Sequence, residues 1–244
     1  MTTYAANWYL EDGSVTVNAD NSGQTVTQGS GSAVPDEAPV ITQRESSVET
    51  GNTITINAAE NATANVTISD VNINTSGKSG KSEAAVSTNG KGNVNIELDG
   101  TNTLQSGRNY AGLEKSNDGK MTITDENENG KLIATGGDGA AGIGGGLYAG
   151  GNDITITGGE VTAAGGTTGA GIGGGLQKNG EKITVSGDAT LKVQGGPTDE
   201  WDGAGAGIGN GGSHNGDFSG SFTPVNGAET EPDYGDRLYR FALK

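Results

Sequence analysis

Apolar residues alternate with polar ones in short runs along this chain. The clearest runs read TITIN, NVTISDVNI, NVNIEL, MTITD, DITITGG and KITVSGD. Alternation of this kind predicts β-strands with one buried and one exposed face. No segment shows the apolar spacing of a helix, so the pattern predicts an all-β protein.

The strands belong to an internal repeat. The stretch LIATGGDGAAGIGGG at 132–146 returns as VTAAGGTTGAGIGGG at 161–175, and as LKVQGGPTDEWDGAGAGIGNG at 191–211, with an insertion. Gly-Gly pairs begin at 136, 165 and 195, which gives a period of 29 to 30 residues. Earlier copies are more degenerate, and five coils are expected between about 65 and 212.

Two sets of positions align the copies. The first set comprises Ala84-Ala85-Val86, Ala111-Gly112-Leu113, Ala141-Gly142-Ile143 and Ala170-Gly171-Ile172. The second comprises the opening strands, in which the pairs expected to stack are Val66 and Ile68, Val94 and Ile96, Met121 and Ile123, Ile154 and Ile156, and Ile183 and Val185.

Each repeat holds three extended segments separated by Gly- or Asn-rich turns. This predicts a three-sided parallel β-solenoid with coils of about 29 residues, in which each coil buries its inner side chains by stacking on the next. Open ends expose strand edges and need covering. We expect an N-terminal cap or irregular first coil over 1–48, the β-helix over 49–212, and a C-terminal cap or a linker to a further domain over 213–244.

Two outward columns follow from strand alternation. If Ile143 points inward, a nearly bare outer strip is formed by Ala85, Gly112, Gly142, Gly171 and Gly207. Glycines of this kind are explained by tight corners in the backbone. The alternative is that they form a smooth strip that contacts a sugar, a polysaccharide or another solenoid.

The second outward column lies on the opening strands and is rich in threonine. Its members are Thr67 and Ser69, Asn95 and Glu97, Thr122 and Thr124, Thr155 and Thr157, and Thr184 and Ser186. Strand propensity alone accounts for these threonines, and an ice-binding face is the alternative.

Composition and charge narrow the partners. The 244 residues include 46 glycines and are only 31% hydrophobic, which suits a narrow solenoid core. A net charge of −16 opposes binding to nucleic acids and to anionic membrane surfaces. There is no cysteine, no apolar run that could cross a membrane, and no signal peptide in MTTYAANWYL. We expect neither a nucleic-acid partner nor membrane insertion. The expected location is extracellular or at the cell surface, with a virus particle as the alternative.

The sequence contains partial matches to phosphate-binding motifs, but the residues around them do not complete any such motif. GDGAAG at 137–142 fits a dinucleotide fingerprint, but the IGGGLYAGGND that follows cannot form the required helix. GKSGKS at 77–82 lacks the first glycine of a phosphate loop, because residue 75 is threonine. No calcium-binding repeat is present, so no cofactor and no metal site is expected.

Catalytic residues are not assigned. The single histidine, His214, lies in a Gly-rich stretch and gives no support for a nucleophilic triad. Pairs of carboxylates drawn from Asp138, Asp199, Glu200 and Asp202 leave polysaccharide cleavage open, because glycoside hydrolysis needs only two such groups.

The insertion PTDEWDGAGA predicts a binding loop, since insertions in a repeat map to loops. Trp201 is flanked there by Asp199, Glu200 and Asp202, and an aromatic face beside hydrogen-bond acceptors is typical of sugar binding. We also expect Tyr110 and Arg108 to project from the equivalent loop two coils earlier, and Tyr148 from the turn after the first GIGGG. The alternative is that Trp201 covers the end of the core as part of a cap.

The stretch ITITGGEVTAAGGTTGAGIGGG, preceded by NVTISDVNI and NVNIELDGTNTLQSGRNYAGLE, resembles the pectin-lyase-like right-handed β-helix domains of extracellular proteins from Gram-positive gut bacteria. These domains are often described as carbohydrate-binding-like. The resemblance covers about 50–212 and implies a single-stranded right-handed parallel β-helix in contact with polysaccharide. No catalytic residue carries over.

The leading hypothesis is a non-catalytic extracellular module that binds carbohydrate or acts as an adhesin. The alternatives are a structural or virion fibre component that self-associates along the glycine strip, an ice-binding protein, and a polysaccharide-cleaving enzyme.

Overall fold

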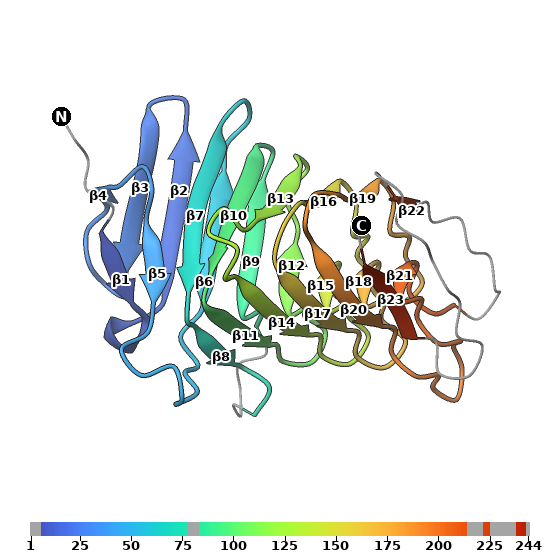
Figure 1. Cartoon of the computed structure of the whole chain (residues 1–244). Coiled ribbons are helices and arrows are strands. Elements are labelled where there is room, and N and C mark those ends of the chain that lie inside the picture. The colour runs from blue at the N-terminus through green and yellow to red at the C-terminus, as the bar shows by residue number, and fades with distance from the viewer. Residues whose placement is uncertain (1–5, 78–82, 214–221, 225–237, 243–244) are drawn as a thin grey trace.

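Three parallel sheets wind around one axis in a computed structural model that describes residues 6–77, 83–213, 222–224 and 238–242. The chain forms an all-β solenoid of about six turns with coils of about 30 residues. In Figure 1 the turns follow one another from the N-terminal end to the C-terminal end of the stack. The sequence therefore predicted the solenoid class and the coil length correctly.

Sheet A collects the opening strand of each turn. Its strands, in order, are β1 (Asn7–Tyr9), β5 (Val40–Thr42), β7 (Thr63–Ser69), β10 (Asn93–Asp99), β13 (Met121–Thr124), β16 (Ile154–Ile156), β19 (Ile183–Val185) and β22 (Phe222–Pro224).

Sheet C holds the second strand of each turn. Its strands are β8 (Asn72–Asn74), β11 (Thr101–Gln105), β14 (Lys131–Thr135), β17 (Glu160–Ala164), β20 (Thr190–Gln194) and β23 (Leu238–Ala242). All of these pair in parallel except β23, which is antiparallel to β20.

Sheet B holds the third strand of each turn. Its strands are β4 (Val34–Pro35), β3 (Gly23–Gln28), β2 (Val15–Asp20), β6 (Ile54–Ala58), β9 (Val86–Gly90), β12 (Leu113–Lys115), β15 (Ile143–Gly144), β18 (Ile172–Gly173) and β21 (Ile208–Gly209). At the N-terminal end this sheet continues as antiparallel strands from β2 to β3 and β4.

The core is a set of stacked columns of like residues. On sheet B, Leu113 pairs with Val86 and with Ile143, and Ile143 pairs with Ile172, all fully buried. On sheet A, Ile123 pairs with Ile96 and Ile156 in the same way. These registers match the alignment read from the sequence, and they explain how 31% hydrophobic residues suffice for a core.

The alignment of the first opening strand was wrong by two residues. Ile96 pairs with Val66, and Val94 pairs with Ala64 rather than with Val66. Because the side-chain period of a strand is two, this shift leaves the buried face unchanged. It makes Asn65 and Thr67, not Thr67 and Ser69, the outward partners of Asn95 and Glu97.

The expected bare glycine strip was also wrong. All five of its members are buried: Ala85, Gly112, Gly142, Gly171 and Gly207. A Cβ on Gly142 would lie 2.7 Å from the main-chain nitrogen of Ala164 and 2.7 Å from the carbonyl oxygen of Gly171. At this corner the end of sheet C packs on the start of sheet B, so the alternate face of the chain is covered by backbone. No strip remains there for a flat partner.

One polar residue lies inside the stack. Asn102 of β11 is fully buried and pairs with Leu132 of β14. Its Oδ1 accepts from the amide of Val71 at 3.3 Å, and its Nδ2 donates to the carbonyls of Asp99 at 3.1 Å and Lys131 at 3.3 Å. The side chain thus ties the corner between sheets A and C across three successive coils.

The N-terminal turn is fastened by side chains. Its 3₁₀ turn, η1 (Leu10–Asp12), lies beside Arg44, whose guanidinium makes a two-pronged ion pair with Asp12 and stands 4.1 Å from the centroid of the Tyr9 ring. The indole of Trp8 donates to Asp36 at 2.8 Å. Within the described ranges, no helix has the length and apolarity to cross a membrane.

Candidate functional site

The insertion between β20 and β21 forms an ordered loop around Asp199. Its Oδ1 accepts from the main-chain amides of Trp201 at 2.8 Å and Asp202 at 2.6 Å, and its own amide donates to the carbonyl of Asp202 at 3.2 Å. The hydrogen bonds from Asp202 and then Trp201 lower the pKa of Asp199. The carboxylate of Asp199 therefore holds the loop closed and lies among backbone donors.

The other end of the loop is fixed to the neighbouring coil. The side chain of Asp202 is largely buried and accepts from Nε2 of Gln177 at 3.1 Å. Between the two aspartates, Glu200 and Trp201 point outward, and Trp201 is 71% exposed. An indole with that exposure does not cover the core, so the cap interpretation of Trp201 is not supported within the described residues.

A second exposed aromatic lies on the same edge. Tyr148 follows β15, is 56% exposed and has a left-handed φ of 57°. Gln177 occupies the equivalent position after β18 with a φ of 59°. The amides of the preceding residues, Leu147 and Leu176, donate to the carbonyls of Asn109 and Gly139, so both loops fold back over the corner between sheets C and B.

We call this edge the corner ridge and define it as Tyr148, Gln177 and the loop 197–203. Neighbouring strands in a sheet are about 4.8 Å apart, which sets the step from Tyr148 to its equivalent, Gln177. Gln177 in turn contacts the loop through Asp202. The ridge therefore carries two exposed aromatic residues, Tyr148 and Trp201, in loops two coils apart along the stack. Sequence reasoning missed Gln177, although its place after the second GIGGG was a signal.

Arg108 and Tyr110 lie at the same corner but nearer the N-terminal end of the stack than the Trp201 loop. Their loop joins β11 to β12, three turns before the insertion and not two as the repeat alignment indicated. Arg108 pairs with Asp138 of the next coil at 3.2 Å, with both side chains largely exposed. Tyr110 is half-buried. The loop of Arg108 and Tyr110 therefore borders Tyr148, because the amide of Leu147 donates to the carbonyl of Asn109 at 2.8 Å, while the Trp201 loop lies three turns away.

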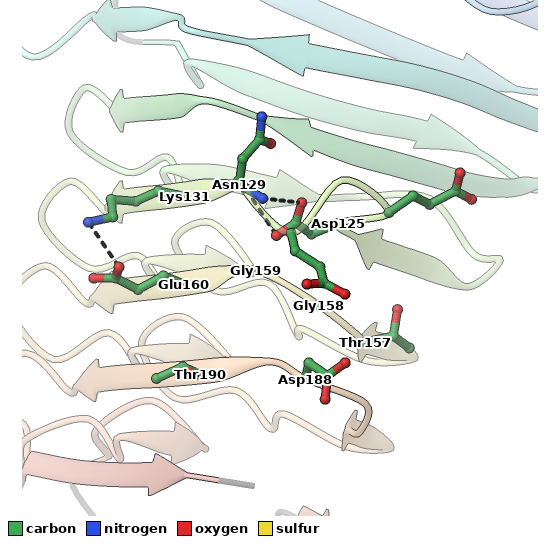
Figure 2. Close-up of a pocket in the computed structure, with 12 residues that line it drawn as sticks. Asp125, Asn129, Lys131, Thr157, Gly158, Gly159, Glu160, Asp188 and Thr190 are labelled. Atoms are coloured by element: carbon green, nitrogen blue, oxygen red, sulfur yellow. Dashed lines mark hydrogen bonds and ion pairs between the residues drawn. The ribbon is translucent and has the colours of Figure 1, made fainter.

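An acidic groove of about 350 Å³ lies at the corner between sheets A and C. In Figure 2 the carboxylate of Asp125 faces its own turn, where it accepts from the amides of Asn129 at 3.2 Å and Gly130 at 3.0 Å. Lys131 pairs with Glu160 of the next coil at 2.9 Å, and Asp188 follows from the coil after that. These contacts stabilise successive turns of the same corner.

A second groove, of about 450 Å³, runs over the outer face of sheet A. Asn95 donates to Asn65 across it at 2.9 Å, and Thr124 is hydrogen-bonded to Glu97. Toward the C-terminal end, four threonines pair in register: Thr122, Thr155, Thr184 and Thr223. The threonine column is therefore regular over four turns and gives way to Asn95 and Asn65 toward the N-terminal end.

Metal binding and histidine chemistry find no support in the described ranges. No cluster of three or more His, Asp or Glu residues there could hold a metal ion. His214 and most of the 77–82 turn lie outside the described residues. Comparison with protein-family models, with curated proteins and with solved structures finds no match to this chain.

Proposed function

We propose that this protein binds carbohydrate, without catalysis, at the corner ridge. The observation that carries the proposal is Trp201, a large apolar ring that is 71% exposed on a loop whose two flanking aspartates are fixed. An exposed aromatic face covers the apolar face of a sugar ring, and the carboxylate of Glu200 next to it is available to accept from sugar hydroxyls.

The rigidity of the loop favours binding. Ordering a flexible loop on association costs free energy, and this cost is avoided where the free loop is already held by hydrogen bonds. Asp199 and Asp202 supply those bonds, so we assign them to positioning the loop, and we assign contact with the glycan to Trp201, Glu200 and Tyr148. The net charge of −16 favours a neutral or cationic glycan over an acidic one.

The line of the ridge favours a polymer. Tyr148 and Trp201 lie in loops two coils apart, with that of Gln177 between them, so they are separated by roughly 10 Å along the axis at about 4.8 Å per coil. A chain of linked sugar rings contacts both, while a single ring contacts one. With the repeat motifs, this supports the further proposal that the protein is a pectin-lyase-like, extracellular β-helix.

The experiment is retention on a panel of insoluble and soluble polysaccharides. Trp201→Ala should weaken binding to the retained glycan by roughly 1–3 kcal/mol, as expected for losing an aromatic anchor. Val48→Ala is the matched control, since Val48 is 59% exposed on the loop after β5, away from the ridge. Equal retention of both variants, or no retention of the wild type by any glycan, would contradict the proposal.

Fluorescence gives an independent measurement. The chain has two tryptophans, and Trp8 is fixed by its hydrogen bond to Asp36. A glycan that covers the ridge should shift the emission of Trp201 to shorter wavelength, and a Trp8→Phe background makes this signal unambiguous.

A further inference from the structure

A buried lysine borders a third hollow, at the edge of sheet B where the chain passes to sheet A. Lys115 ends β12 at an inward position, pairs with Thr88 of β9 and is only 5% exposed. Its Nζ donates to the main-chain carbonyl of Asn117 at 2.6 Å. Thr88 donates to the side chain of Asn117 at 2.8 Å, so the amine belongs to a small polar group within the stack.

The hollow beside it has a volume of about 350 Å³ and opens at the corner between sheets B and A. Lys115 lines it together with Asp118 of the same coil and with Asn152 and Asp153 of the next. Asp153 also pairs with Lys182 of the following coil, at 3.4 Å. A residue with a buried amine thus lines a space that has two carboxylate residues on its walls.

Burial lowers the pKa of Lys115, while the carboxylates of Asp153 and Asp118 act in the opposite direction. A lowered pKa leaves a larger fraction of the amine neutral near pH 7 than in an exposed lysine. The neutral amine is the form that attacks carbonyl carbon.

We propose that Lys115 forms a reversible imine with small uncharged aldehydes that enter this hollow. The nitrogen lone pair adds to the aldehyde carbon, the carbonyl oxygen takes up a proton, and the nitrogen loses one. The resulting carbinolamine expels water and leaves a C=N bond, so no oxidant or reductant is consumed. The protonated imine is a cation, which Asp118 and Asp153 stabilise, and the same two charges disfavour anionic aldehydes.

The test is reductive trapping of the intact protein. Propionaldehyde and cyanoborohydride are added at pH 7, and the alkylated lysines are mapped by mass spectrometry. Lys120 is the internal control because it is exposed on the same segment. Lys115 should be alkylated faster than Lys120 at this pH, because burial lowers the pKa of Lys115 and leaves more of its amine neutral.

One variant sharpens the result. Lys115→Met should abolish the fast modification and leave that of Lys120 unchanged. The wild-type ratio decides the matter even if a variant fails to fold: modification of Lys115 no faster than that of Lys120, or only after denaturation, would overturn the proposal.

Discussion

Gly142 shows how little space one residue has at the corner of a coil. A methyl group there would lie 2.7 to 2.8 Å from three main-chain atoms of Ala164 and Gly171. Backbone atoms do not move aside as the end of a flexible side chain does. A side chain at this position therefore forces two coils apart.

We expect Gly142→Ala to lower the free energy of unfolding by about 1–3 kcal/mol, the usual cost of overpacking. Gly77→Ala is the control, since a Cβ at Gly77 meets nothing within 4 Å. Chemical denaturation of both variants checks the prediction. A stable Gly142→Ala variant would mean that the corner can open without loss.

Asn102 makes the opposite point, because here a side chain is required. Replacing it with alanine removes the acceptor of the Val71 amide and one donor to each of the carbonyls of Asp99 and Lys131. We expect Asn102→Ala to lower the free energy of unfolding by about 1–3 kcal/mol or more, the cost of leaving buried polar groups unpaired. Asn18→Ala, which removes a surface bond from Asn57, should change it by roughly 0.5 kcal/mol or less.

At the scale of one element, the loop 197–203 depends on the charge of Asp199. Its pKa is lowered in the folded protein, so the stabilisation is present above the ordinary aspartate pKa and is lost as the pH falls through the lower, folded value. In a Trp8→Phe background, the fluorescence anisotropy of Trp201 should therefore drop below about pH 3.9.

Asp199→Asn separates charge from geometry. The asparagine oxygen still accepts the two amide hydrogens but does not titrate, so the loop should stay ordered in acid. An identical acid transition in both proteins would show that another group controls the loop.

Strand elements were predictable from the sequence because alternation reports which face is buried. The stack of Ile96, Ile123 and Ile156 was predicted on this basis. Alternation fails at β15 and β18, which are two residues long and covered on both faces by adjoining backbone. It also fails at Lys115, where LEK reads as the exposed end of a strand. Burial there depends on the neighbouring coil, which the local pattern does not contain.

The corner ridge was predictable only in part, because it is formed by contacts between coils that the local sequence pattern does not contain. Trp201 was expected in a loop because the insertion interrupts the repeat. Its alignment with Tyr148, and the bond from Gln177 to Asp202, arise from loops of different turns that approach one another only after stacking.

At the scale of the whole molecule, one repeat should be removable. Deleting 147–175 joins Gly146 to Leu176 and regenerates the GIGGG-Leu junction. The cut also places Ile123 of β13 beside Val185 of β19, and Leu132 of β14 beside Leu191 of β20. Aliphatic side chains therefore still stack on aliphatic side chains. We expect a folded, shorter solenoid, seen as retained β circular dichroism and a cooperative melt.

Deleting 147–160 instead is the control. This cut removes β16 and the first residue of β17 and joins Gly146 to Val161, so a strand of sheet C follows where a strand of sheet A is required. We expect this protein to aggregate or unfold. Similar behaviour of the two deletions would argue against coil-by-coil stacking as the source of stability.

Tyr148 and Gln177 have the same left-handed backbone conformation at equivalent positions of two successive turns. They are related by translation along the axis, so each added or removed turn moves the Trp201 loop by one fixed step of about 4.8 Å relative to everything before it. For the proposed ligand, selectivity would then depend on how well the spacing of the coils matches the repeat length of the polymer. If the proposed carbohydrate binding holds, a change in the number of turns between Tyr148 and Trp201 should change which polymer is bound, with no substitution in the residues that touch it.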